Sequence, residues 1–156
     1  MSAKRNGFTL VELIVVISII MVLAAMIIPG LTKGQYLSKK AATKSEISNM
    51  ETALALYESD YGAYPDDDED NSSKNLVDAL KGNSQPEEGQ ARKKAYYPFK
   101  SKQIIDGEYY SVLNKPFKYR ENASEATKTE EMKNPDTFDI WTSDGRSSDE
   151  GINNWD

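Results

Sequence analysis

The stretch that decides the fold is GFTLVELIVVISIIMVLAAMIIPG, residues 7–30. Residues 13–32 carry no charged side chain, and a run of this length forms about 30 Å of α-helix. That length matches the hydrocarbon thickness of a bilayer. Leu, Ile, Val and Met occur on every side of such a helix, so lipid or other apolar helices must cover its whole surface. The stretch therefore predicts a membrane-spanning helix.

Charged residues stand only at the beginning of this run. By the positive-inside rule, Lys4 and Arg5 place the N-terminus in the cytoplasm and the rest of the chain on the other side. Glu12 lies at the start of the apolar helix. Inserting a charged side chain at the centre of a membrane helix costs about 2.5–3.5 kcal/mol, and near the end of the helix the cost is smaller. Two hypotheses are open for Glu12: a carboxylate that only reaches the interface, and a group with a partner in an assembly. An ordinary cleaved signal peptide fits less well, because its apolar region is shorter.

The composition of the 156 residues excludes several classes of function. The net charge is -6, with 25 acidic and 19 basic side chains, whereas nucleic-acid binders typically present a basic surface. There is no histidine and no cysteine, so the commonest general base, thiolate metal ligands and disulfides are all missing. No phosphate-binding glycine pattern occurs. We therefore expect no enzyme and no nucleic-acid partner, and any bound metal must be a hard cation held by oxygen.

The segment after the apolar run has the pattern of an amphipathic helix. Its apolar residues follow at spacings of 3, 4, 3 and 4, which places them on one face: Ile47, Met50, Leu54, Tyr57 and Tyr61. Its charged residues are expected to face water: Lys44, Glu46, Glu51 and Glu58. The apolar face predicts packing onto a small globular part. Gly62 and Pro65 predict the end of the helix.

The remaining chain reads as a small α+β part. Residues 66–70 are five consecutive acids and predict a solvated loop. Residues 75–81 predict a short helix ended by Gly82, and residues 83–94 a polar loop. Aromatic bursts then alternate with turn residues in AYYPF, GEYYSVL, KPFKYRE and TFDIWTS, which predicts a small antiparallel sheet. Residues 121–135 are charged and predict an excursion between two strands.

The stretch KRNGFTLVELIVV, residues 4–16, resembles the class III signal sequence of type IV pilins and pseudopilins. The shared pattern is a short basic leader ending in glycine, then phenylalanine, with glutamate as the fifth residue of the mature chain. The resemblance implies that a prepilin peptidase cuts between Gly7 and Phe8 and methylates the new amine. It also implies that Glu12 pairs with the Phe8 amine of a neighbouring subunit during filament assembly. Opposite charges attract strongly in a low-dielectric helix bundle, where each alone would be costly.

Pro29 and Gly30 interrupt the apolar pattern. Proline removes a backbone donor and crowds the preceding turn, so we expect a helix break or kink at this point. Pilin-like chains commonly carry proline here. The resulting division of the chain has four parts: a leader at 1–7, an apolar transmembrane or filament-core helix at 8–32, its amphipathic continuation at 33–62, and a globular α+β head at 63–156.

Three further stretches resemble pseudopilins. YESDYGAYPDD, residues 57–67, is similar to the segment that ends their long helix, and Asn114-Lys115-Pro116 is similar to the turn before their first strand. DTFDIWTSDGRSSDEGINNWD, residues 136–156, resembles the C-terminus of the major pseudopilins of type II secretion. There, a strand leads into a loop that binds one calcium ion. Here the strand would place Phe138 and Ile140 on one face.

The resemblance implies a calcium site in this final loop. Its candidate ligands are Asp144, Asp149 and Ser147, with Glu150 as a replacement for Asp149 and Asp139 as a weaker candidate. Calcium takes six to eight oxygen ligands and needs neither histidine nor cysteine. The alternative is an Asp144-Gly145 turn with surface acids and no metal. Trp155 is expected to pack the loop against the head.

Together these features predict an α+β, pilin-like fold in which a long N-terminal helix packs on a small antiparallel sheet. The resemblance implies a structural, non-enzymatic subunit of a periplasmic pseudopilus of type II secretion, anchored in the inner membrane by one span with its head outside the cytoplasm. Its partners would be further copies of itself, a prepilin peptidase, the secretion platform and minor pseudopilins. A major type IV pilin of a surface filament is the alternative, although such pilins often carry a disulfide. A membrane-tethered binding domain is a more remote alternative.

Overall fold

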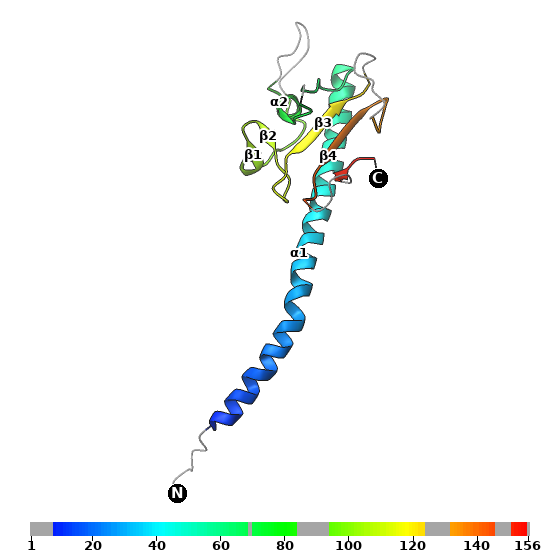
Figure 1. Ribbon diagram of the computed structural model, residues 1–156. Coiled ribbons are helices and arrows are strands. Elements are labelled where there is room, and N and C mark those ends of the chain that lie inside the picture. Colours follow the sequence, from blue (N-terminus) through cyan, green and yellow to red (C-terminus); the bar gives the residue numbers. More distant parts are fainter. Residues whose placement is uncertain (1–7, 69, 84–93, 124–131, 146–150, 156) are drawn as a thin grey trace. The chain divides into compact units, whose positions relative to one another are not determined.

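The computed structural model describes five stretches of the chain: residues 8–68, 70–83, 94–123, 132–145 and 151–155. The chain divides into two compact units, Met1–Ser38 and Lys39–Asp156. Helix α1, Leu10–Tyr61, contributes residues to both units (Figure 1). Short antiparallel strands and one further helix follow it. The predicted α+β, pilin-like class is confirmed.

The first unit consists, in its described part, of the apolar beginning of α1. Its large apolar side chains from Phe8 onward are exposed in the isolated chain, Phe8 itself at 77% and Met26 at 75%. Among the described residues, α1 is the only helix long and apolar enough to cross a membrane. Each Å² of such surface left in water costs about 25 cal/mol. This surface therefore requires a cover of lipid or of other apolar helices.

Pro29 and Gly30, where a break or kink is predicted, lie inside helix α1. Helix α1 runs through both positions without an interruption in its helical backbone. A proline removes a single N–H···O bond from a helix, and the bonds on either side can keep the backbone helical. The predicted kink or local opening at Pro29 and Gly30 stays a prediction. Loosening of the helix inside a filament stays a prediction.

In the second unit, the last turns of α1 pack into the core. Ile47, Met50 and Leu54 are completely or almost completely buried, which confirms the predicted apolar face. Helix α1 ends at Tyr61, and Gly62 follows with a φ of 78°. The N–H of Gly62 still donates to the carbonyl of Glu58 at 2.6 Å. A glycine in the left-handed region directly after a helix is the commonest helix stop, and the sequence predicted this one.

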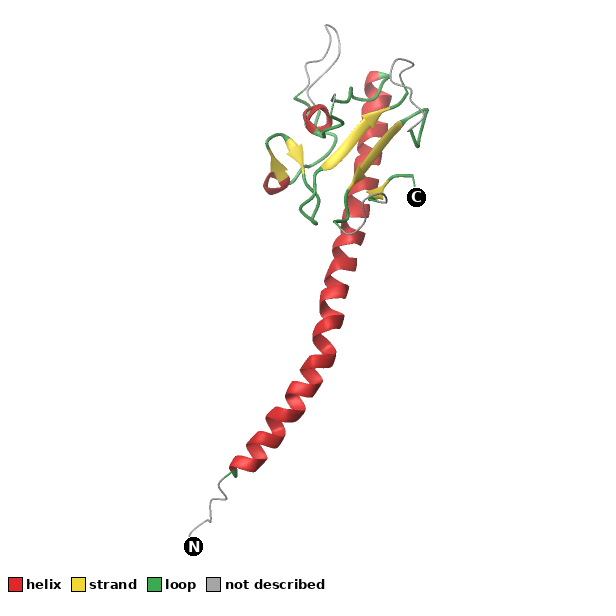
Figure 2. Cartoon of the chain, viewed as in Figure 1, coloured by secondary structure: helices red, strands yellow, loops and turns green. Residues whose placement is uncertain are grey.

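A three-stranded antiparallel sheet covers this part of α1 (Figure 2). Its strands are β3 (Phe117–Glu121), β4 (Phe138–Thr142) and β5 (Ile152–Asn153), in that order. The inward residues of β3 and β4 form the core together with α1: Phe117, Tyr119, Phe138 and Ile140. The bursts KPFKYRE and TFDIWTS are thus the main strands, as predicted.

A small hairpin lies beside this sheet. Strands β1 (Ile104–Ile105) and β2 (Glu108–Tyr109) pair antiparallel, after a short 3₁₀ turn at Ser101–Gln103. Asp106 and Gly107 connect them with φ values of 52° and 87°. Two positive φ values in a two-residue loop are the signature of a type I′ turn, which matches the twist of the flanking strands. Within the stretch GEYYSVL, only the residues of β2 therefore form a strand.

Helix α2, Lys74–Leu80, confirms the predicted short helix. Its buried residues join the core: Leu76, Val77, Ala79 and Leu80. The burst AYYPF forms no strand. Instead, the N–H groups of Tyr96 and Tyr97 both donate to the carbonyl of Leu80, at 2.8 and 3.2 Å, and so hold this segment against the end of α2.

Candidate assembly and metal sites

Thr9 and Glu12 form a reciprocal capping box at the start of α1. The backbone N–H and the hydroxyl of Thr9 both donate to Oε2 of Glu12 at 2.8 Å. The backbone N–H of Glu12 donates in turn to Oγ1 of Thr9 at 3.2 Å. The first backbone donors of a helix have no partner within the helix, and this arrangement satisfies two of them. Glu12 therefore has a local structural role before any assembly.

Sequence analysis missed the role of Thr9. The spacing Thr-x-x-Glu directly before an apolar run is the signal that would have found it. Both donors from Thr9 go to Oε2, which leaves Oε1 of Glu12 as the oxygen that a further donor could reach. The capping box and a pairing with an amine are thus geometrically compatible.

The predicted processing site is described only in part. Phe8 precedes the helix and is exposed, while Gly7 lies outside the described residues. Cleavage between Gly7 and Phe8 therefore stays a prediction.

The predicted calcium loop joins β4 to β5. Asp144 is half-buried at a turn in which the N–H of Gly145 donates to the hydroxyl of Ser143 at 3.1 Å. Ser147, Asp149 and Glu150 lie outside the described residues. Within the described part of the chain, no three acidic side chains come close enough to hold a metal ion. The calcium site stays a prediction.

Asp139, the weaker calcium candidate, is a structural anchor. It is completely buried, and its Oδ2 accepts hydrogen bonds from Nη2 of Arg120 at 2.8 Å and from the N–H of Lys133 at 3.1 Å. Its Oδ1 accepts from the N–H of Asn134 at 3.0 Å. Burial acts to raise the pKa of Asp139, but these hydrogen bonds outweigh it and hold the pKa below its usual range. Both oxygens therefore accept hydrogen bonds from the loop before β4, and Oδ2 also accepts one from Arg120 of β3.

Glu46 corrects a second expectation. It was predicted to face water, but it is only 6% exposed. Its Oε1 accepts a hydrogen bond from Nζ of Lys100 at 2.8 Å, and the hydroxyl of Tyr109 approaches the same oxygen at 3.5 Å. The hydrogen bond to Glu46 raises the pKa of Lys100, whose side chain remains 61% exposed. Helical periodicity gives the face on which Glu46 lies but not the segment, here around Lys100, that covers this face.

The final residues of the chain are fixed to β4. The side-chain amide of Asn154 accepts from the N–H of Ile140 at 3.0 Å and donates to the carbonyl of Phe138 at 3.2 Å. The ring of Trp155 lies 6.1 Å from the ring of Trp141. Trp155 thus packs beside Trp141 of β4, and its predicted contact with the final loop stays a prediction because residues 146–150 lie outside the described residues.

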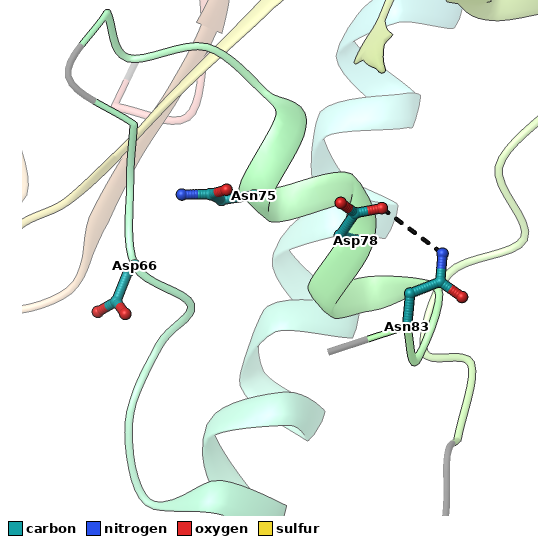
Figure 3. Close-up of a pocket in the computed structure, with 4 residues that line it drawn as sticks. All are labelled: Asp66, Asn75, Asp78 and Asn83. Atoms are coloured by element: carbon teal, nitrogen blue, oxygen red, sulfur yellow. Dashed lines mark hydrogen bonds between the residues drawn. The ribbon is translucent and has the colours of Figure 1, made fainter. Parts of the chain in front are cut away.

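One hollow in the described part of the second unit does not have the form of an active site. Figure 3 shows this hollow of about 350 Å³, lined by Asp66, Asn75, Asp78 and Asn83. Asp78 and Asn83 form a hydrogen bond of 3.5 Å, while Asp66 points elsewhere. All four residues are exposed. Small-molecule sites are mostly apolar concavities with a few convergent polar groups, and this hollow has neither property.

Comparison with known proteins places these features in a class. The family described as the prokaryotic N-terminal methylation motif matches residues 2–28. The chain thus carries the methylation motif of the type IV pilin superfamily, followed by a pilin-like α+β fold. The resemblance predicted from residues 4–16 is confirmed. This superfamily consists of structural subunits, in agreement with the expectation that the chain is not an enzyme.

The chain is also similar to individual proteins of this class. The chain is 42% identical over 62 residues to type II secretion system core protein G of Escherichia coli strain K12, which covers 40% of this chain and 43% of that protein. It is 34% identical over 83 residues to core protein G of Pseudomonas aeruginosa, covering 53% and 57%. It is also similar to the type IV major pilin protein PilA of Myxococcus xanthus, 38% over 63 residues, covering 40% and 29%. The matched region thus spans about half or less of these relatives. No solved structure matches the chain.

Proposed function

We propose that the chain is the structural subunit of a periplasmic pseudopilus that drives protein export by type II secretion. The observation that carries this proposal is the apolar first part of α1, which is exposed on all sides in a chain with the methylation motif. Lipid covers this surface before assembly, and identical helices of other copies cover it in the filament. The similarity to two core proteins G supports type II secretion as the setting.

Assembly on this proposal depends on Glu12. Cleavage after Gly7 leaves a positively charged amine on Phe8, and this amine pairs with the Glu12 carboxylate of a neighbouring copy. Inside a helix bundle of low dielectric constant, an unpaired charge costs several kcal/mol, whereas a hydrogen-bonded pair offsets much of that cost. Copies that are displaced along the filament lose the pair. Glu12 therefore selects the correct register more than it adds stability.

The partners follow from the same proposal. The inner membrane holds the unassembled subunit by its apolar helix, with the second unit on the periplasmic side. A prepilin peptidase processes the leader, and the secretion platform and minor pseudopilins organise the growing polymer. The chain performs no chemistry of its own.

A major pilin of a surface filament is the second candidate function, and the similarity to PilA of Myxococcus xanthus supports it. Imaging separates the two. We expect short polymers confined to the periplasm of cells that produce the chain with its assembly machinery. Long fibres on the cell surface would favour the pilin, and dispersed monomers in the membrane would overturn both. Mass spectrometry of the mature chain should show a methylated Phe8 as the first residue.

We also propose that the loop between β4 and β5 binds calcium through Asp144, Asp149 and Ser147, with Glu150 as a replacement. The proposal is supported by the oxygen-only donor set of this loop. It is further supported by the pairing of Thr142 with Ile152, which fixes both ends of the loop. A bound calcium ion would neutralise the acids of the loop and hold it closed.

A further inference from the structure

A group of lysines follows the apolar run. Residues 13–45 contain four lysines and no acidic residue, and we call them the lysine segment: Lys33, Lys39, Lys40 and Lys44. All four side chains are exposed. Residues 46–156, by contrast, carry 24 of the 25 acidic side chains and 13 of the 19 basic ones. The positive charge after the apolar run is therefore concentrated next to it, and the rest of the chain is strongly acidic.

We propose that the lysine segment binds the anionic headgroups of phospholipids at the membrane surface where the apolar helix emerges. This inference rests on the membrane insertion proposed above. Chain connectivity carries it, because Lys33 directly follows Thr32, the last residue of the uncharged run. Lys39 lies seven positions after Thr32, and even a fully extended chain of that length spans no more than about 25 Å. Lys33 thus lies at the headgroup phosphates in every inserted copy, and Lys39 and Lys40 follow within a short length of chain.

The charge distribution supports the same partner. An acidic surface is repelled by an anionic bilayer, and this repulsion acts on the second unit. Clusters of lysines beside a membrane span have the opposite effect, since they attract anionic lipids over about one Debye length. The lysine segment therefore places positive charge, which anionic lipids attract, at the interface between membrane and water.

Membrane orientation does not explain these lysines. The positive-inside rule counts basic residues near the ends of a span, and here Lys4 and Arg5 precede the apolar run while four lysines follow it. Lys4 and Arg5 account for the predicted orientation, and the four lysines after the span do not add to it. Their presence on an exported side requires another role. Headgroup binding supplies one, and both leaflets expose headgroup phosphates.

A second copy of the chain is the competing partner, since its residues 66–70 are acidic. Connectivity brings lipid to the lysine segment in every inserted copy, whether or not that copy has a neighbour. The observations thus favour lipid. Lys44 lies close enough to Glu51 to influence the pKa of that carboxyl, so the inference rests on Lys33, Lys39 and Lys40.

Residue-resolved labelling tests the inference. The full chain is inserted at low density into vesicles of phosphatidylcholine, either alone or with one third phosphatidylglycerol. A membrane-impermeant amine reagent is added, and mass spectrometry gives the labelling rate of each lysine. We expect several-fold slower labelling of Lys33, Lys39 and Lys40 in the anionic vesicles, reversed at about 1 M salt, where the Debye length falls to about 3 Å. Lys74 and Lys115, exposed lysines of the second unit, serve as internal controls with unchanged rates.

Equal labelling in both vesicles would overturn the inference. Protection that appears only at protein densities that allow assembly, whatever the lipid, would assign the lysines to a second copy and overturn it as well. Protection by soluble glycerol phosphate without anionic lipid would show general phosphate binding instead. A Lys39→Gln/Lys40→Gln variant should reduce the protection of Lys33, while the charge-matched Lys74→Gln/Lys115→Gln variant should not. The comparison of the two vesicle compositions at low density does not depend on polymerisation, so its failure is distinguishable from failure of the filament proposal.

Discussion

At the scale of single residues, the capping role of Glu12 and its proposed role in assembly can be separated by substitution. Glu12→Gln keeps an oxygen for the capping box with Thr9 and removes the charge. We expect normal processing and insertion but a loss of polymer of more than about tenfold, because without the carboxylate the Phe8 amine is an unpaired charge inside the helix bundle, at a cost of about 3–5 kcal/mol. Cross-linking of the membrane fraction measures the polymer. Thr9→Ala is the matched control, since it removes about 0.5–2 kcal/mol of capping but keeps the charge and should assemble.

Asp139 is the acid on which the second unit depends most. Asp139→Asn leaves the buried side of Arg120 without its negative partner and should lower the free energy of unfolding by roughly 2–4 kcal/mol. Urea titration of the full chain in detergent measures this change. Asp136→Asn removes an exposed acid of the same region and should shift stability by less than about 0.5 kcal/mol. A similar effect of both substitutions would contradict the anchoring role.

The pH dependence of stability follows from the same carboxylate. The pKa of Asp139 in the folded chain lies below the unfolded value of about 3.9, so the unfolded state binds more protons in acid. The stabilisation is therefore complete above about pH 5 and is lost as the pH falls through the folded pKa. Asp139→Asn should flatten the loss of stability below about pH 5 that the parent chain shows.

Glu46 is expected to behave differently from Asp139, although both are buried acids with a basic partner. Its Oε2 is buried and receives no hydrogen bond from the described residues, and its partner Lys100 is mostly in water. Removing Glu46 also removes the cost of burying its carboxylate, and the exposed ammonium group of Lys100 is left in water rather than as an unpaired buried charge. Glu46→Leu should therefore change the free energy of unfolding by less than about 1 kcal/mol in urea titration. A loss of more than about 3 kcal/mol would show that the carboxylate is essential.

Neither buried acid could have been predicted from the sequence. Alternation placed Asp139 opposite Phe138 and Ile140, which indicates a surface position, and helical spacing did the same for Glu46. Both positions are buried by partners more than 15 residues away in the chain, Arg120 and Lys100. Local sequence patterns carry no information about residues far away in the chain that bury such an acid.

At the scale of elements, local chemistry determined what could be predicted. The end of α1 at Tyr61 follows from Gly62, a residue that adopts a positive φ without strain. The strands β3 and β4 follow from alternating aromatic and polar residues. AYYPF has the same composition but forms no strand, because its N–H groups bind Leu80 instead of a neighbouring strand. Propensity cannot decide between such partners.

The type I′ turn between β1 and β2 gives a prediction at this scale. Gly107→Ala places a side chain at a φ of 87° and should destabilise the second unit by about 1–2 kcal/mol. Thermal unfolding measures the effect. Gly34→Ala is the matched control, because this helical glycine has open space around it and alanine is the better helix former by about 1 kcal/mol. Equal destabilisation by both substitutions would contradict the assigned turn.

At the scale of the whole molecule, a bound ion would act on the stability of the second unit. If the loop between β4 and β5 binds calcium, removing the ion with a chelator should lower the melting temperature by roughly 5–10 °C, the effect of a ligand near 100 times its dissociation constant. Asp144→Ala should abolish the response, while Asp136→Ala should retain it. Identical melting curves with and without chelator would exclude the site.

The two units also differ in how much of their structure and role could be predicted from the sequence. An uninterrupted apolar run and the spacing of Gly7, Phe8 and Glu12 are local, and they predicted both the helix and the class of protein. The capping role of Thr9 was local too and was overlooked. The packing of the second unit depends on long-range pairing, which single-residue patterns do not encode.

The pairing of Glu12 with a neighbouring chain end is the central claim, and a structure of the assembled polymer tests it most directly. The quantity to measure is the distance from the nitrogen of Phe8 in one copy to the carboxylate of Glu12 in the next. We predict a separation of about 3–4 Å, the range of a hydrogen-bonded ion pair. A polymer in which Glu12 contacts only Thr9 of its own chain, with the Phe8 amine far from any Glu12, would contradict the account.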